Sequence, residues 1–172
     1  MSNVNIFNIK PIGVASFLVL ISVGVLSSVY LSQYWGGLKP CNLCIYQRVA
    51  WWIVCGLGLL AFGFAQYPRL WSALVYLCGL ILVVGGSVAA YHVGIEQHWW
   101  PGPASCAGGE VMPTSLEDLK ARNLDTPVAL CDQVSWSLFG ISMAGYNTIL
   151  SFLAGLASFT AVWFVRVRNS YE

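Results

Sequence analysis

The chain has 172 residues, of which 58% are apolar and 9% are charged, and its formal net charge is +1. A typical soluble domain carries roughly 25% charged residues, so a soluble globule of this composition could not cover its surface with polar groups. Disorder is excluded because it requires low hydrophobicity and high net charge. The eight Lys and Arg residues form no basic cluster, which argues against nucleic-acid binding. We therefore expect an integral membrane protein.

Four long stretches lack Asp, Glu, Lys and Arg, and each is long enough for the roughly 20 residues that cross a bilayer. We predict one all-α membrane domain over residues 1–172, with transmembrane helices at about 12–33, 45–65, 71–91 and 144–165. A short loop at 34–44 and a long loop at about 92–143 then lie on the same side of the membrane. Pro and Gly divide the long loop, so we expect it to be mostly irregular, with one short helix at 115–123 that Ser115 can cap.

Basic residues close to the predicted spans indicate the orientation. When Lys120 and Arg122 are left out because they lie far from any span, Lys39 and Arg48 remain on the side of the two loops. The opposite side carries four: Lys10, Arg69, Arg166 and Arg168. Cytoplasmic segments carry an excess of Lys and Arg, so both termini are predicted to be cytoplasmic and both loops exported.

The six cysteines fall into two groups. Cys55 and Cys78 lie inside predicted spans, where a free cysteine usually packs as a small apolar residue. The other four lie on the exported side, in an oxidising compartment where disulfides persist: Cys41, Cys44, Cys106 and Cys131. Four cysteines allow three pairings, and the sequence alone leaves the pairing open.

Cys41 and Cys44 form a C-x-x-C motif just before the second predicted helix. Such a motif closes too small a ring to restrict the unfolded chain much, and it is more often redox-active than structural. A helix N-terminus favours the thiolate. Arg48 lies one helical turn after Cys44, where a guanidinium can stabilise that anion or bind an acceptor oxygen; the alternative is an arginine that extends to the membrane interface.

Two cysteine pairs on one side of the membrane suggest a relay of thiol–disulfide exchange. Structural zinc is the rival for four cysteines, but it prefers closely spaced pairs, and 24 residues separate Cys106 from Cys131. We therefore predict no metal site. The electrons of a relay need a lipid-soluble acceptor, because the sequence has neither a placed G-x-G-x-x-G fingerprint nor a C-x-x-C-H haem motif. A dissolved quinone is the acceptor that remains.

These features together resemble a known family. The stretch P-C-x-x-C-I-Y-x-R at residues 40–48 stands at the head of the second of four helices, and a second cysteine pair follows in the longer exported loop. Trp136, Gly140 and Gly145 precede the last span. This order of features, over essentially the whole chain, resembles the DsbB family of disulfide bond formation proteins.

The resemblance implies a role for each of the four exported cysteines. Cys41 and Cys44 would be the pair next to the quinone, and Cys44 would be the thiolate that engages the quinone ring. Cys106 would be attacked by a reduced, periplasmic, thioredoxin-fold oxidant of the DsbA type. Cys131 would then relay to Cys41.

The resemblance also implies residues around the quinone. Arg48 matches the family arginine beside the ring. The family histidine near the end of the third helix has two candidates here, His92 and His98, and His92 fits better by its distance from the span; an interfacial histidine without chemistry is the alternative. Tyr46 and Trp52 are weaker candidates for lining a ring pocket, because aromatic residues at such positions are more often part of the interfacial belt or the core.

The function implied is a quinone-dependent protein-disulfide oxidoreductase of the bacterial inner membrane. It would reoxidise a periplasmic DsbA-like dithiol and pass the electrons through both cysteine pairs to ubiquinone or menaquinone. Two alternatives stay open. One is a paralogous oxidoreductase with a different thioredoxin-fold partner or the opposite electron flow, and the other is a non-catalytic membrane scaffold with structural disulfides.

Overall fold

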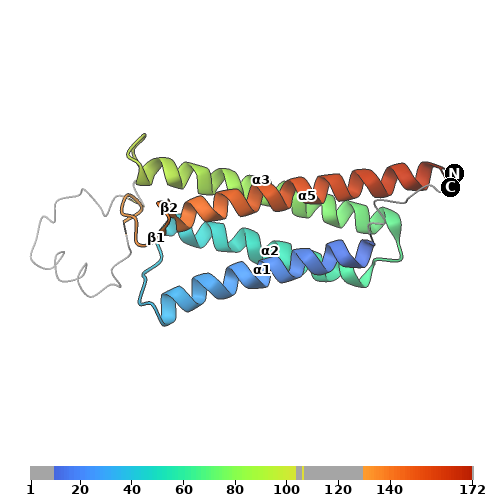
Figure 1. Ribbon diagram of the computed structural model, residues 1–172, viewed down its shortest axis with the longest axis horizontal. Helices are drawn as coiled ribbons and strands as arrows, with labels where there is room; N and C mark the ends of the chain where they lie inside the picture. The colour runs from blue at the N-terminus through green and yellow to red at the C-terminus, as the bar shows by residue number, and fades with distance from the viewer. Residues whose placement is uncertain (1–9, 104–105, 107–129, 172) are drawn as a thin grey trace, which may run out of the picture.

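In the computed structural model, the protein is a helical bundle (Figure 1). The structure describes residues 10–103, Cys106 and residues 130–171, with side chains described up to residue 167. These residues include four helices long and apolar enough to cross a membrane: α1 (Pro11–Tyr34), α2 (Asn42–Gly63), α3 (Pro68–Glu96) and α5 (Met143–Tyr171). The predicted all-α class and four-helix transmembrane architecture are confirmed. The helix predicted at 115–123 lies outside the described residues.

The four helices start one to three residues earlier than the sequence predicted, and α1, α3 and α5 also end later. Proline occupies the first turn of α1 and of α3, where its missing N–H costs no hydrogen bond and its fixed φ suits a helix. Helix α3 accordingly begins at Pro68, three residues before the start predicted at about 71. Its end lies five residues beyond the one predicted at about 91. The helix continues for another turn to Glu96, so that His92 and Glu96 belong to a helix and not to the loop.

A small hairpin precedes α5 where the sequence predicted irregular loop. Strands β1 (Ser137–Leu138) and β2 (Ile141–Ser142) pair antiparallel. Both residues of the turn between them, Phe139 and Gly140, have positive φ, the geometry that matches the twist of a two-residue hairpin. The Ser142 hydroxyl then accepts a hydrogen bond of 3.1 Å from the Gly145 N–H, which caps the first turn of α5. The hairpin thus fixes where α5 begins.

Helix α3 is the centre of the bundle. It packs extensively against α5 and α2, whereas α1 packs mainly on α2 and barely touches α5. Glycines permit the close approach of α3 to α5, because a Cβ at Gly79 would lie 2.6 Å from the ring of Phe159 and one at Gly86 would lie 3.0 Å from Cβ of Ser151. The poor contact between α1 and α5 leaves a gap on the other side of the bundle.

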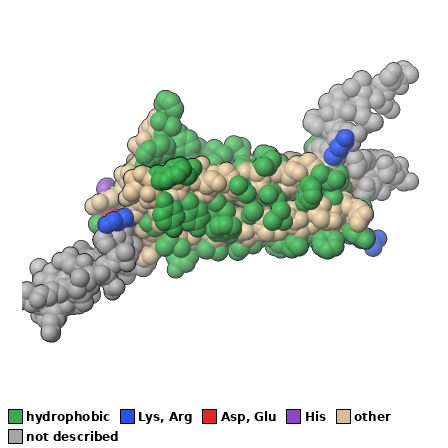
Figure 2. All heavy atoms as spheres, turned by 90° about the horizontal axis from the view of Figure 1, so that it is seen from below, with side chains coloured by type: hydrophobic (Ala, Val, Ile, Leu, Met, Phe, Trp, Pro, Cys, Tyr) green, Lys and Arg blue, Asp and Glu red, His purple; other side chains and the backbone are tan. Residues whose placement is uncertain are grey.

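The outer surface fits a multi-pass membrane protein. On the face in Figure 2, hydrophobic side chains cover the length of the bundle, and Lys and Arg side chains lie towards its two ends. Large apolar residues are exposed along all four helices, among them Leu20, Leu59, Val84 and Leu156. Figure 1 shows the start of α1 and the end of α5 at one end of the bundle, with the hairpin and the start of α2 at the other.

Candidate functional site

The four predicted redox cysteines form two disulfides that lie together. Cys41 is bonded to Cys44, and Cys106 is bonded to Cys131. Residues of both pairs belong to one buried cluster, which also contains Ile95 of α3. The second pair is further fixed by backbone hydrogen bonds from the Cys106 N–H to the Pro103 carbonyl (2.8 Å) and from the Cys131 N–H to the Cys106 carbonyl (3.4 Å). The fold therefore brings the two pairs within one small region at the end of the bundle.

The C-x-x-C motif was predicted to lie just before the second helix. In the structure it forms the N-cap and the first turn of α2. Cys41 is the N-cap, and its Sγ accepts a hydrogen bond of 3.2 Å from the Cys44 N–H. The free N–H groups and positive dipole at a helix start stabilise negative charge on a nearby sulfur. Both residues line a cavity, but Cys41 is only 3% exposed, whereas Cys44 is partly exposed. Of the two sulfur-bearing residues, Cys44 is the more accessible from that cavity.

This cavity, of about 600 Å³, opens in the gap between α1 and α5. Near the Cys41–Cys44 disulfide its walls are polar, and farther into the membrane they are apolar. The polar wall residues include Gln33, Cys44, Gln47, Arg48, His92, Glu96 and Asn147, and the apolar ones include Ile21, Val25, Leu26, Val29 and Leu150. A site with a few converging polar groups at one end of an apolar cleft suits a small molecule with a polar head and an apolar tail.

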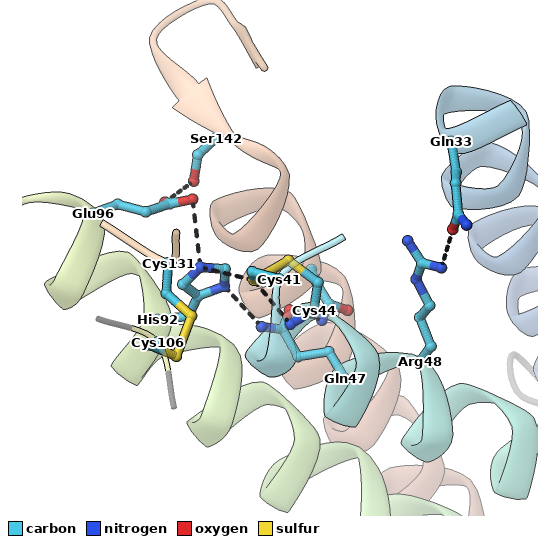
Figure 3. The surroundings of a disulfide bond; sticks show 11 residues. Gln33, Cys41, Cys44, Gln47, Arg48, His92, Glu96, Cys106, Cys131 and Ser142 are labelled. Carbon is cyan, nitrogen blue, oxygen red and sulfur yellow. Dashed lines mark hydrogen bonds and ion pairs between the residues drawn. A yellow bond between two sulfur atoms is a disulfide. The ribbon is translucent and has the colours of Figure 1, made fainter. Parts of the chain in front are cut away.

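Arg48 lies on the side of the cavity formed by α1. Its Nη1 donates a hydrogen bond of 2.5 Å to Oε1 of Gln33, and its guanidinium carbon lies 5.2 Å from the centre of the Tyr30 ring. Figure 3 shows Arg48 turned towards Gln33, with the Cys41–Cys44 disulfide between it and His92. The arginine thus places a positive charge on the cavity wall, held by two α1 side chains.

His92 lies on the opposite side, against the cysteines. Its Nε2 is 3.6 Å from Sγ of Cys41 and 4.0 Å from Oε1 of Glu96, and its Nδ1 is 3.0 Å from Nε2 of Gln47. The ring is also within hydrogen-bonding reach of the backbone of Cys131. His98 is exposed and follows the end of α3. Of the two candidate histidines, the structure therefore brings His92, and not His98, to the cysteine pairs.

Several polar residues at the site were missed by the sequence analysis, namely Gln33, Gln47, Glu96, Ser142 and Asn147. Glu96 was treated as a loop residue, yet its carboxylate accepts a hydrogen bond from the Ser142 hydroxyl. The position of Gln47 could have been noticed in the sequence. It lies on the face of α2 that carries the apolar residues Leu43, Trp51 and Val54, and a polar residue on an apolar helix face indicates a buried hydrogen-bonding partner.

Neither of the two weaker aromatic candidates lines this cavity, which fits the alternative that they belong to the interfacial belt. Tyr46 is 66% exposed and Trp52 is 55% exposed, and the cavity is lined instead by Trp51. Neighbouring residues on a helix point about 100° apart, so Trp51 faces inwards where Trp52 faces out.

The site also has the donor atoms of a soft-metal cluster. The ligand atoms of Cys41, Cys44 and His92 lie within 4.8 Å of one another. In the described state, however, the two sulfurs are bonded to each other, and thiolates are the form that binds metal.

The fold and the site together define a class of protein: a four-helix membrane protein in which a disulfide at a helix start lies between a second disulfide and a cavity. The family model described as disulfide bond formation protein DsbB matches residues 13–161. The chain therefore belongs to the DsbB family, and disulfide oxidoreductase activity follows from that membership.

Curated relatives agree with this assignment. The disulfide bond formation protein B of Dechloromonas aromatica is 30% identical over 155 residues, which cover 87% of this chain and 86% of the relative. The protein of the same name from Nitrosomonas europaea is 39% identical over 83 residues, covering 48% of this chain and 47% of the relative. An uncharacterised protein of Rickettsia prowazekii is 26% identical over 137 residues, covering 78% and 77%. No solved structure gives a significant match.

Proposed function

We propose that the protein is a quinone-dependent thiol oxidase of the bacterial inner membrane. It reoxidises a periplasmic, thioredoxin-fold dithiol of the DsbA type and passes the electrons through Cys106–Cys131 and Cys41–Cys44 to ubiquinone or menaquinone. The observation that carries this proposal is the placement of Cys44: its disulfide adjoins the loop disulfide on one side and the cavity on the other.

The relay proceeds by thiol–disulfide exchange. The partner's thiolate attacks Cys106, and the Cys131 thiolate leaves with the electron pair of the broken bond. A second partner thiolate then closes the partner's disulfide and releases Cys106 as a thiolate. Cys131 attacks Cys41, and Cys44 leaves as a thiolate on the cavity wall. Two partner thiols are thereby oxidised, and the reducing equivalents reach Cys44 and the remaining loop thiol.

The cavity fits a quinone. A quinone bound there would accept two electrons and two protons, and the protein's own groups would bind and orient it. The guanidinium of Arg48, held by Gln33 and Tyr30, would stabilise negative charge on a ring oxygen. The apolar walls formed by residues such as Ile21, Val25 and Leu150 would bind an isoprenoid tail and exclude water.

The proposed orientation places both termini in the cytoplasm and the cysteine end in the periplasm. It is supported by the basic residues at the opposite end of the bundle, where Lys10 precedes α1, Arg69 lies in the first turn of α3 and Arg166 lies near the end of α5. Oxidising conditions on the periplasmic side suit two disulfides at the other end.

The decisive experiment follows quinone absorbance with purified protein in detergent, a reduced DsbA-like substrate and added ubiquinone. We expect loss of the oxidised quinone signal only when both protein and thiol substrate are present. Cys44→Ser should abolish this reaction. Cys55→Ser, at a free cysteine that does not line the cavity, should retain it.

Retained turnover in Cys44→Ser would contradict the role of that sulfur. If ubiquinone and menaquinone were both inert, a panel of other soluble C-x-x-C proteins would distinguish the alternatives. Reduction of the loop pair by one of them would indicate a paralogous oxidoreductase. Cysteines that stayed oxidised with every reduced partner, with a quinone-site inhibitor present, would indicate structural disulfides.

A further inference from the structure

A chain of hydrogen bonds leads from the middle of the bundle to Cys41. The Trp51 indole N–H of α2 donates to Oδ1 of Asn147 on α5 at 2.7 Å. Nδ2 of Asn147 donates to Oε1 of Gln47 at 2.6 Å, and Nε2 of Gln47 lies 3.0 Å from Nδ1 of His92. Figure 3 shows the last part of this chain, in which Gln47 faces one ring nitrogen of His92 and Cys41 faces the other.

The direction of the chain is fixed at its start. An indole N–H can only donate, so Asn147 must present its oxygen to Trp51. The hydroxyl of Ser151 also donates to this oxygen, at 3.3 Å. Asn147 must then present its amide N–H₂ to Gln47, and Gln47 must present its own N–H₂ to His92. Nδ1 of His92 is therefore an acceptor, and a neutral imidazole carries its one proton on the other nitrogen, Nε2.

The groups on the far side of the ring fit the same proton position. Nε2 faces Sγ of Cys41 at 3.6 Å and Oε1 of Glu96 at 4.0 Å, and sulfur and carboxylate oxygen are both acceptors. The other oxygen of Glu96 accepts from the Ser142 hydroxyl. Gln47, Trp51 and His92 are buried, so water has little access to replace these bonds or reverse their direction.

We propose that Trp51, Asn147 and Gln47 are positioning residues that hold His92 as the Nε2–H tautomer, so that His92 donates a hydrogen bond to Cys41 whenever Cys41 becomes a thiolate. Hydrogen bonds to an ionised acceptor are stronger than those between neutral groups, so the fixed tautomer favours the Cys41 thiolate. In this tautomer Nε2 carries a proton and has no lone pair for a metal ion, which disfavours metal binding by Cys41, Cys44 and His92.

The step that this hydrogen bond would assist is the release of Cys41 as a thiolate, and it rests on the proposed function. In a mixed disulfide between Cys131 and Cys41, the Cys106 thiolate attacks Cys131. The Cys106–Cys131 bond forms, the Cys131–Cys41 bond breaks, and Cys41 leaves with the electron pair as a thiolate. The Nε2–H of His92 stabilises that charge as it develops. Electrons balance within the protein, and no further oxidant is required for this step.

The tautomer can be measured without quinone or partner. The chain contains two histidines, and His98→Asn leaves only His92; asparagine accepts the positive φ of 57° found at this exposed position. In the oxidised protein labelled with ¹⁵N-histidine, the ring nitrogens differ strongly in chemical shift according to whether they carry a proton. We expect a protonated Nε2 and an unprotonated Nδ1. A protonated Nδ1, or an even mixture, would overturn the proposal whatever the enzyme's activity.

A pair of tryptophan variants tests whether Trp51 sets the tautomer of His92. Trp51→Phe removes the indole that sets the direction, and the hydroxyl of Ser151 cannot replace it because a hydroxyl both donates and accepts. We expect this variant to give a mixture of tautomers. Trp71→Phe is the matched control, since this buried indole donates to the Pro11 carbonyl at the other end of the bundle, and its spectrum for His92 should be unchanged. An unchanged tautomer in Trp51→Phe would overturn the role of the chain.

A second readout concerns the Cys41 sulfur itself. In protein with Cys44, Cys106 and Cys131 replaced by serine, the rate of Cys41 alkylation is measured against pH. Trp51→Phe should move the profile to higher pH and slow alkylation at neutral pH by about three- to tenfold. A profile that Trp51→Phe and Trp71→Phe leave equally unaffected would show that His92 does not stabilise the thiolate.

Discussion

The guanidinium of Arg48 on α2 is held by the side-chain carbonyl of Gln33 on α1, at 2.5 Å. This bond joins the two helices beside the cavity, and the Tyr30 ring lies against the same guanidinium. Gln33 has no charge of its own, so it orients the arginine and leaves its positive charge available. The position of that charge therefore depends on a residue that does not belong to the C-x-x-C stretch.

Replacing Gln33 by alanine should loosen Arg48 without removing it. We expect the apparent KM for quinone to rise about tenfold, which corresponds to roughly 1.4 kcal/mol, the scale of a hydrogen bond to a charged group. Exchange between the soluble dithiol and the loop pair should be unaffected. Steady-state quinone reduction measures the first effect, and Gln66→Ala, in the exposed turn before α3, is the control. An unchanged KM would mean that Gln33 does not position Arg48.

Filling the cavity should block quinone use selectively. Gly24 lines the cavity, and a Cβ added there would meet nothing within 4 Å. Gly24→Leu should therefore fold, occupy the apolar part of the cavity and raise the apparent KM for quinone severalfold. Gly13→Leu makes the same change on α1 at another open position that does not line the cavity. Equal KM values for the two variants would place the quinone elsewhere.

The Ser142 hydroxyl makes two hydrogen bonds that stabilise the fold. Its hydroxyl caps α5 by accepting from the Gly145 N–H, and it donates to the carboxylate of Glu96. Ser142→Ala should lower the free energy of unfolding by about 1–2 kcal/mol, because it removes an N-cap and leaves Glu96 with one partner fewer. Ser87→Ala, at an exposed hydroxyl bonded to its own helix, should change it little. Thermal unfolding in detergent compares the two, and equal midpoints would contradict the prediction.

The contact between α3 and α5 requires glycine at residue 79. A methyl group there would lie 2.6 Å from the ring of Phe159, so Gly79→Ala should destabilise the bundle by about 1–3 kcal/mol through overpacking. Gly56→Ala, at an exposed position of α2 with nothing within 4 Å, should be neutral or stabilising because alanine is the better helix former. Midpoints of thermal unfolding measure both changes. A Gly79→Ala protein as stable as the parent would disprove the close packing.

The proposed orientation can be tested at two exposed glutamines. Gln66 lies in the turn between α2 and α3, and Gln97 follows the other end of α3. A membrane-impermeant thiol reagent applied to intact spheroplasts should label Gln97→Cys and reach Gln66→Cys only after lysis. The four site cysteines are protected as disulfides, and Cys55 and Cys78 are buried. If Gln66→Cys were labelled in intact spheroplasts and Gln97→Cys only after lysis, the orientation would be the opposite of the one proposed.

The sequence by itself determined the class of the fold and the positions of the cysteines. Uncharged, apolar stretches of about 20 residues have the length of a membrane-spanning helix, which satisfies its own backbone groups in a bilayer, so the four spans follow from the sequence. Cys41, Cys44 and Arg48 stand in one short motif near the start of the second helix, and the family resemblance rested on the same residues. The end of α3 did not follow from composition. Its last residue, Glu96, is charged, and its side chain is buried against Ser142, a contact that only the tertiary structure provides.

Only the tertiary structure decided what surrounds the cysteines. Asn147 meets Gln47 from 100 residues away along the chain, and it meets Trp51 from 96 residues away. No local pattern specifies such a pairing, since it depends on how α5 and α2 are rotated and how closely they approach. The same holds for the cavity, which exists because glycines draw α5 against α3 and leave α1 apart from it. Local hydrophobicity sets where each helix lies in the chain, whereas packing between helices sets which side chains meet.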